Sequence, residues 1–71
     1  ANINEEQDAQ SRNDFISKLS ISLKEARESK YWIELLKETN YLTKKETESI
    51  IDDIIELIKL LTTIIKTTKR N

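Results

Sequence analysis

The segment Asn40-Tyr41-Leu42-Thr43-Lys44-Lys45-Glu46 contains the end of one expected helix and the start of another. Asn adopts the left-handed backbone conformation more readily than most residues, so Asn40 is suited to the position that ends a helix. Thr43 and Glu46 match the T-x-x-E capping box, in which each side chain accepts a hydrogen bond from the other residue's backbone N–H. The connection is therefore short, and short connections make two helices antiparallel. The sequence predicts an all-α chain folded as an antiparallel helical hairpin.

The helix before the corner is expected to span about residues 11–39. Ser11 and Asp14 resemble a capping box, since a hydroxyl and a short carboxylate both favour a helix start. Residues 1–10 (ANINEEQDAQ) show no sustained hydrophobic period, so we expect an irregular or frayed lead-in, or the tail of an upstream element. The apolar residues that recur at helical spacing after Ser11 include Ile16, Leu19, Leu23 and Ala26.

The helix after the corner (residues 40–43) is expected to span about residues 44–69. Its Ile and Leu residues form two adjacent lines, which together are wider than the seam of a two-helix coiled coil. One neighbouring helix covers only part of this surface, and folded proteins rarely leave large apolar patches in water. We therefore expect a four-helix bundle, completed by self-association or by two further N-terminal helices. The residues predicted to lie at the oligomer interface are Ile50, Ile54, Leu57, Ile58, Leu61, Ile64 and Ile65.

The composition excludes several classes of function. The chain has 71 residues, 37% hydrophobic and 35% charged, with a net charge of −1, which fits one small helical domain. It has no Cys, His or Gly, which removes thiolate and imidazole metal ligands, the usual general base near neutral pH and glycine-rich phosphate loops. A core in so short a chain rarely suffices without cross-links, a metal or association.

Carboxylates and hydroxyls are frequent but form no recognisable catalytic pattern. Glu25 with Glu28, and Asp53 with Glu56, are spaced to share a helix face, and we interpret both pairs as solvated. We therefore expect a protein that is not an enzyme and has no cofactor, metal or small-molecule substrate. The acidic first half of the second helix disfavours a membrane surface. The polar first ten residues lack the features of a signal peptide, so we expect a cytoplasmic protein.

A basic and aromatic segment, residues 24–32, permits two interpretations. In the first, cations contact phosphates and an aromatic ring stacks on a base; the candidate nucleic-acid contacts are Arg12, Lys24, Arg27 and Lys30. In the second, Trp32 packs in the bundle while Lys and Arg pair with Glu one helical turn away. The net charge of −1 favours the structural interpretation, because nucleic-acid-binding domains are usually basic.

Several segments together resemble a known family. They are Ser11-Arg12-x-Asp14-Phe15-Ile16, Leu23-Lys24-Glu25-Ala26-Arg27-Glu28, Tyr31-Trp32-Ile33-x-Leu35-Leu36 and the corner Asn40-Tyr41-Leu42. In these segments the chain resembles the bacterial four-helix-bundle proteins encoded in intervening sequences of 23S ribosomal RNA genes. The resemblance implies that residues 1–71 correspond to the last two helices of that bundle. A similar bundle is a nucleic-acid-binding accessory of reverse transcriptase in diversity-generating retroelements.

Two functions are expected from these observations. The first is a non-enzymatic structural or interaction module that self-associates in the bacterial cytoplasm, with a dimer of hairpins as the favoured assembly. The second is an RNA-binding accessory module that uses the basic residues of the first helix.

Overall fold

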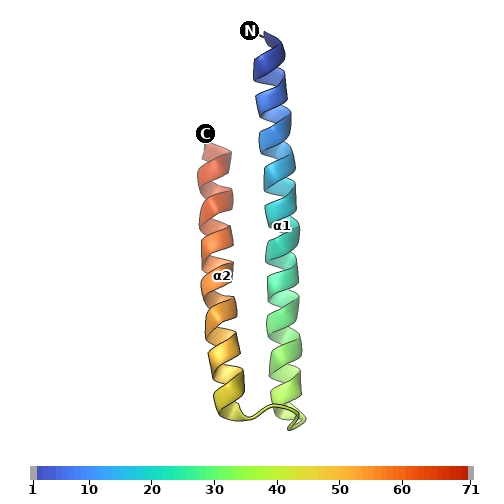
Figure 1. The fold of residues 1–71 in the computed structure, drawn as a ribbon, viewed down its shortest axis with the longest axis vertical. Coiled ribbons are helices and arrows are strands. Elements are labelled where there is room, and N and C mark those ends of the chain that lie inside the picture. The colour runs from blue at the N-terminus through green and yellow to red at the C-terminus, as the bar shows by residue number, and fades with distance from the viewer. Residues whose placement is uncertain (1, 71) are drawn as a thin grey trace.

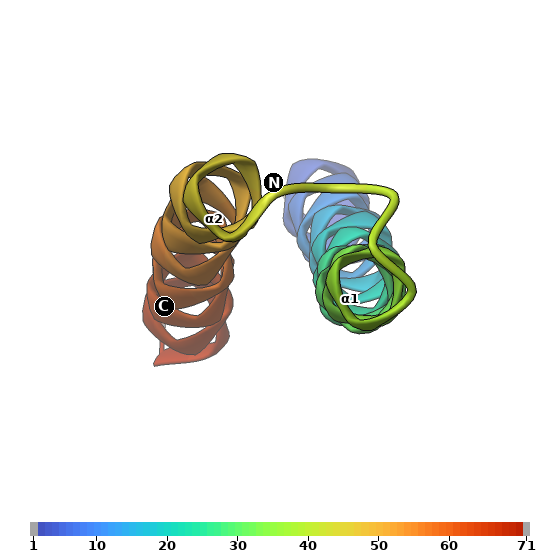
Figure 2. The same ribbon diagram turned by 90° about the horizontal axis from the view of Figure 1, so that it is seen from below.

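The chain forms two long helices joined by a short corner. The computed structural model describes the backbone of residues 2–70 and the side chains of residues 8–70. Helix α1 spans Asn2–Glu38 and helix α2 spans Lys44–Arg70. The two run antiparallel and side by side along the whole of α2, in a molecule 58 Å long and 15 Å by 12 Å across (Figures 1 and 2). The predicted all-α helical hairpin is confirmed.

Helix α1 begins earlier than the sequence pattern indicated. It is continuous from Asn2, so Ser11 lies inside the helix, and the expectation of an irregular lead-in is wrong for residues 2–10; residue 1 lies outside the described residues. This segment contains neither Gly nor Pro, and five of its nine residues are Glu, Gln or Ala, which favour helix without needing an apolar stripe. Because α1 has 37 residues and α2 has 27, the start of α1 extends past the end of α2 (Figure 1).

Helix α1 ends at a left-handed residue, as predicted. Asn40 has a φ of 66°. The Tyr41 N–H donates to the Leu36 carbonyl at 2.9 Å, and the Asn40 N–H donates to the Lys37 carbonyl at 3.1 Å. These two bonds form a Schellman motif, which satisfies carbonyls that the last helical turn leaves free. The Thr39 hydroxyl also donates to the carbonyls of residues 35 and 36.

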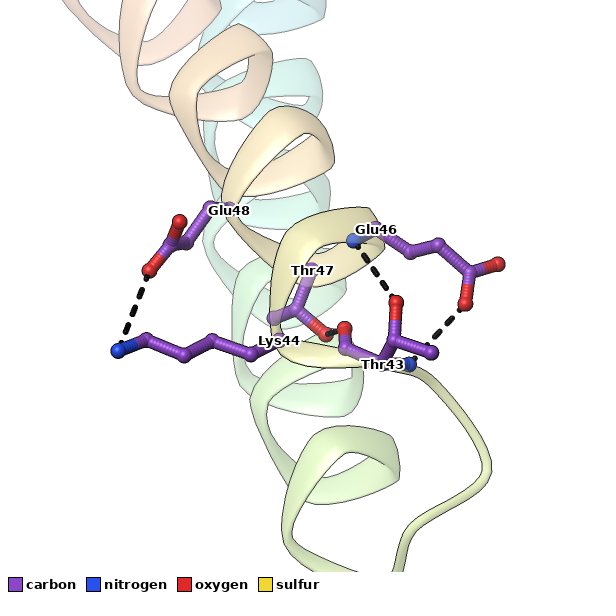
Figure 3. A network of polar contacts seen from close by, with 5 residues as sticks. All are labelled: Thr43, Lys44, Glu46, Thr47 and Glu48. Carbon is purple, nitrogen blue, oxygen red and sulfur yellow. Dashed lines mark hydrogen bonds and ion pairs between the residues drawn. The ribbon is translucent and has the colours of Figure 1, made fainter.

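Helix α2 begins with the predicted capping box. The Glu46 N–H donates to the Thr43 hydroxyl and the Thr43 N–H donates to a Glu46 carboxylate oxygen, both at 3.1 Å (Figure 3). The Thr47 hydroxyl, one turn into α2, donates to the Thr43 carbonyl at 2.9 Å. Hydrogen bonds with Thr43, from its hydroxyl first and its backbone amide second, hold the pKa of Glu46 below its ordinary value of 4.5.

The core is a narrow seam between the helices. Its residues follow steps of three and four, the spacing of a coiled-coil contact, and all are buried or half-buried. They are Ile16, Leu19, Leu23, Ala26, Lys30 and Ile33 in α1, and Thr47, Ile51, Ile54, Ile58, Leu61, Ile65 and Thr68 in α2. Among the described side chains, the buried apolar residues are only Ala26, Leu61 and Ile65. One hairpin therefore encloses very little apolar volume.

Candidate self-association surface

Large apolar side chains remain exposed along one flank of each helix. Residues seven apart lie nearly in line along a helix, because seven residues make almost two turns. The exposed line of α1 includes Phe15, Ser22, Ser29 and Leu36, with Trp32 beside it. The corresponding line of α2 consists of Ile50, Leu57 and Ile64, with Leu60 beside it; Ile64 is half-buried and the other three are exposed.

Both flanks belong to the same side of the hairpin. In each helix the exposed residue directly precedes a seam residue, as Leu57 precedes Ile58 and Ser22 precedes Leu23. The flank is therefore rotated from the seam in the same sense on both helices. For two right-handed helices that face each other and run antiparallel, the same rotation leads to the same side of the pair. We call this side the apolar face.

The opposite side of the hairpin is charged. Its residues directly follow seam residues; they include Arg27 and Glu34 in α1, and Glu48, Asp52, Lys59, Lys66 and Lys69 in α2. All seven are exposed. We call this side the charged face. The hairpin is thus amphipathic as a unit, although each face has exceptions: Lys18, Glu25 and Asp53 also precede seam residues, and Tyr31 and Ile55 follow them.

The structure divides the predicted oligomer interface between the seam and the apolar face. Leu61 and Ile65 are each only 8% exposed. Both residues face α1 in the seam, and their contact with a second molecule stays a prediction. Ile54 and Ile58 are half-buried in the seam, whereas the apolar face carries Ile50, Leu57 and Ile64. Helix α1 thus covers the middle of the broad Ile/Leu stripe of α2 and leaves one edge of that stripe exposed.

The predicted oligomer interface contains residues of α2 alone, whereas α1 also contributes exposed residues to the apolar face. Phe15 is 48% exposed and Trp32 is 58% exposed in the single hairpin, so the alternative in which Trp32 packs in a bundle stays a prediction. Its only described aromatic neighbour is Tyr31, whose ring lies edge-on at a centroid distance of 5.3 Å and an interplanar angle of 72°. The repeat of Phe15, Ser22, Ser29 and Leu36 at intervals of seven is the sequence signal that identifies this line.

The four candidate nucleic-acid contacts do not form one cluster. Arg27 lies on the charged face, and Lys24 lies on the outer edge of the same side because it follows the seam residue Leu23. Arg12 lies seven residues before the seam residue Leu19 and therefore on the same line along α1. Lys30 is half-buried in the seam, and its ammonium group pairs with the Glu34 carboxylate at 3.1 Å.

Cationic side chains of α2 that the sequence interpretation did not include lie on the charged face. They are Lys59, Lys66 and Lys69, and all three are exposed. Lys24 and Arg27 therefore share a side of the hairpin with them. The signal in the sequence is that every charged residue after Glu56 is basic.

The described residues provide few features of a chemical site. Within residues 8–70, no group of three or more acidic side chains is arranged to hold a metal ion, and every buried side-chain polar atom has a hydrogen-bond partner. A shallow open depression at the start of α2 is lined by Lys45, Glu46, Ser49 and Ile50. Neither helix, over its described length, combines the length and apolarity that a bilayer crossing requires.

Comparison with known protein families gives one match. The family model described as "23S rRNA-intervening sequence protein" matches residues 1–63, which is most of the chain. No curated protein and no solved structure matches the chain. The matched region includes all of α1, the corner and most of α2, so it contains both elements that build the apolar face.

Proposed function

The chain belongs to the family of 23S rRNA-intervening sequence proteins, and from this premise we propose that it is a non-enzymatic helical module that self-associates. The apolar face of one hairpin packs against the apolar face of a second copy, and the four helices form a bundle. A bacterial cytoplasm is the proposed location, as the family resemblance implies. The role of the module is structural: it presents the charged faces of the assembly to other molecules.

The observation that supports this proposal is that six of the nine exposed large apolar side chains among the described residues lie on the apolar face; the other three are Ile21, Tyr31 and Tyr41. Leu57 and Leu60 of α2 and Trp32 of α1 are each about half exposed on the same face. Scattered single apolar residues are normal on a protein surface, but a continuous face on two adjacent helices is typical of an interface. Both α1 and α2 need a neighbouring helix on the apolar face. A second hairpin is the smallest unit that supplies both neighbours.

Sedimentation equilibrium of the full chain tests the proposal, with two variants. Leu57→Asp introduces a charge on the apolar face. Thr63→Asp introduces the same charge at an exposed position on the side of α2 that faces away from α1. We expect twice the monomer mass for the native chain and for Thr63→Asp, and a shift toward monomer for Leu57→Asp. A folded monomer at high micromolar concentration would overturn the proposal, as would an unchanged mass for Leu57→Asp.

A second candidate function is RNA binding by the charged face. The observation that favours it is that Lys24 and Arg27 of α1 share this side of the hairpin with Lys59 and Lys66 of α2. Phosphate contacts by such cations give binding that weakens steeply as salt rises. A gel-shift titration with 23S rRNA fragments over a salt series tests this candidate.

The gel-shift titration compares two charge-reversal variants, one on the charged face and one near the corner. Arg27→Glu reverses a charge on the charged face, whereas Lys45→Glu reverses one near the corner, outside the group of four. We expect Arg27→Glu to weaken binding several-fold more than Lys45→Glu. Equal effects, or no shift of the native chain at low salt, would exclude this function.

A further inference from the structure

The half of the charged face that lies away from the corner carries cations and no carboxylate. In residues 17–27 of α1 and 59–69 of α2, every residue that directly follows a seam residue is Ser, Thr, Lys or Arg. The cations among them are Lys24, Arg27, Lys59, Lys66 and Lys69, and all five are exposed. The carboxylates of Glu28 and Glu56 belong to the sides of the two helices opposite to the seam.

These five cations have no acidic partner in the part of the chain that the structure describes. The ion pairs there join Lys18 to Asp14, Lys30 to Glu34 and Lys44 to Glu48. Lys24 forms no such pair, although Glu28 follows it at the spacing of one helical turn. Unpaired cations gathered on one side of two packed helices attract a polyanion, and the phosphates of a nucleic acid supply that charge.

An exposed aromatic ring lies beside these cations on the same side of the hairpin. Tyr31 directly follows the seam residue Lys30, and its side chain is 60% exposed. It lies one helical turn after Arg27 and two turns after Lys24, so the three side chains are neighbours along α1. Trp32, which contacts Tyr31 edge-on, lies on the apolar face instead. Tyr31 is therefore the aromatic residue of this segment that a ligand of the charged face can reach.

We propose that the charged face binds single-stranded RNA, with phosphates on the five cations and a base stacked on Tyr31. This inference rests on the second candidate function, RNA binding, and specifies the form of the RNA and one contact residue. Proteins that bind single strands combine a cationic track for the backbone with aromatic rings for the bases. A duplex keeps its bases paired and stacked, so it offers no free base to a tyrosine ring. The position of Tyr31 therefore favours the single strand.

The charged face also limits the length of strand that it contacts. Lys59 and Lys69 are ten residues apart, which is about 15 Å at 1.5 Å per residue. This length matches about four or five phosphates at the roughly 3.4 Å spacing of one stacked strand. In the half nearer the corner, the charged residues that follow seam residues are acidic and exposed; they are Glu34, Glu48 and Asp52. These carboxylates repel phosphate, so the cationic track ends beside Tyr31.

Fluorescence anisotropy of the full chain with an end-labelled RNA tests the inference at low salt. The probes are an unstructured single strand of about 12 nucleotides, longer than the track, and the same strand annealed to its complement. We expect tighter binding of the single strand. Tyr31→Ala should weaken that binding at least about fivefold, the lower limit for losing one base–aromatic stack. Tyr31→Phe keeps the ring and should bind like the native chain, as should Tyr41→Ala, which removes an exposed tyrosine at the corner.

The salt dependence of binding separates stacking from phosphate contact. Arg27→Gln should lower the slope of log affinity against log salt by about 0.7, the value for one phosphate contact on a single strand. Tyr31→Ala should keep the native slope, because a stacked ring releases no counterions. Tighter binding of the duplex, native affinity for Tyr31→Ala, or an equal loss of slope in both variants would overturn the inference and leave RNA binding intact. If neither probe binds at low salt, RNA binding itself fails, and this inference fails with it.

Discussion

Asn40 determines where α1 stops. At a φ of 66° a Cβ atom crowds the backbone, and Asn tolerates this better than other residues with a side chain. Asn40→Gly should keep the melting temperature or raise it slightly, because Gly adopts this conformation at no steric cost. Asn40→Ala should destabilise the hairpin by about 1 kcal/mol, since Ala lacks that tolerance. Thermal unfolding followed by circular dichroism compares the variants, and equal losses for Gly and Ala would contradict the cap.

The capping box gives the stability of the hairpin a pH dependence. The carboxylate form of Glu46 accepts the hydrogen bonds of Thr43, so its pKa is lower in the folded state than the ordinary 4.5. Its stabilising effect is therefore complete above about pH 4.5 and is lost as the pH falls through the lowered value. Glu46→Gln keeps an acceptor oxygen but has no titration.

Urea unfolding near pH 7 and near pH 3 tests this dependence. The native chain should lose more stability on acidification than Glu46→Gln does, and the difference between the two measures the contribution of this carboxylate. Thr43→Ala should cost about 1 kcal/mol near neutral pH, as the loss of an N-cap hydroxyl usually does. Identical acid sensitivity of the native chain and Glu46→Gln would show that the capping box does not titrate with folding.

At the scale of the helices, the corner could be predicted from local residues. Which side of each helix is buried and which is exposed could not. The hydrogen bonds of Thr43 and Glu46 connect residues three apart, so the sequence pattern contains all of their geometry. The start of α1 was missed because residues 2–10 carry no apolar stripe, which is a signal of packing and not of helix formation. The broad Ile/Leu stripe of α2 identifies a buried surface, but it does not say which edge α1 covers.

The seam depends on a small residue in α1. Ala26 is 6% exposed between larger seam residues, so its small side chain lets α2 approach closely. Ala26→Leu should force the helices apart and destabilise the hairpin by about 1–3 kcal/mol, the usual cost of overpacking. Glu28→Leu, at an exposed position on the side of α1 opposite to the seam, is the matched control and should change the melting temperature little. A similar small effect for Ala26→Leu would mean that the seam is loosely packed.

At the scale of the molecule, the thin seam and the uncovered apolar face both indicate that one hairpin alone has little hydrophobic stabilisation. The three buried apolar residues among the side chains of residues 8–70 provide little hydrophobic stabilisation, in a rod 58 Å long, against the entropy of ordering two helices. In the proposed assembly, a second hairpin on the apolar face turns one narrow seam into a core shared by four helices, in which Trp32 and Leu57 are enclosed. Folding and association are therefore expected to be coupled.

Coupled folding and association predicts that stability depends on protein concentration. If the folded state is a dimer, mass action favours it at high concentration, and the melting temperature should rise by several degrees for each tenfold increase in concentration. Leu57→Asp should lower the melting temperature and weaken its concentration dependence, because the charge removes affinity from the apolar face. Thr63→Asp should keep the native dependence, since Thr63 is exposed outside that face. Circular dichroism melts over a hundredfold range of concentration provide the measurement. A melting temperature that stays constant over that range, with helicity retained, would mean that one hairpin is stable alone and that the apolar face contributes nothing to the fold.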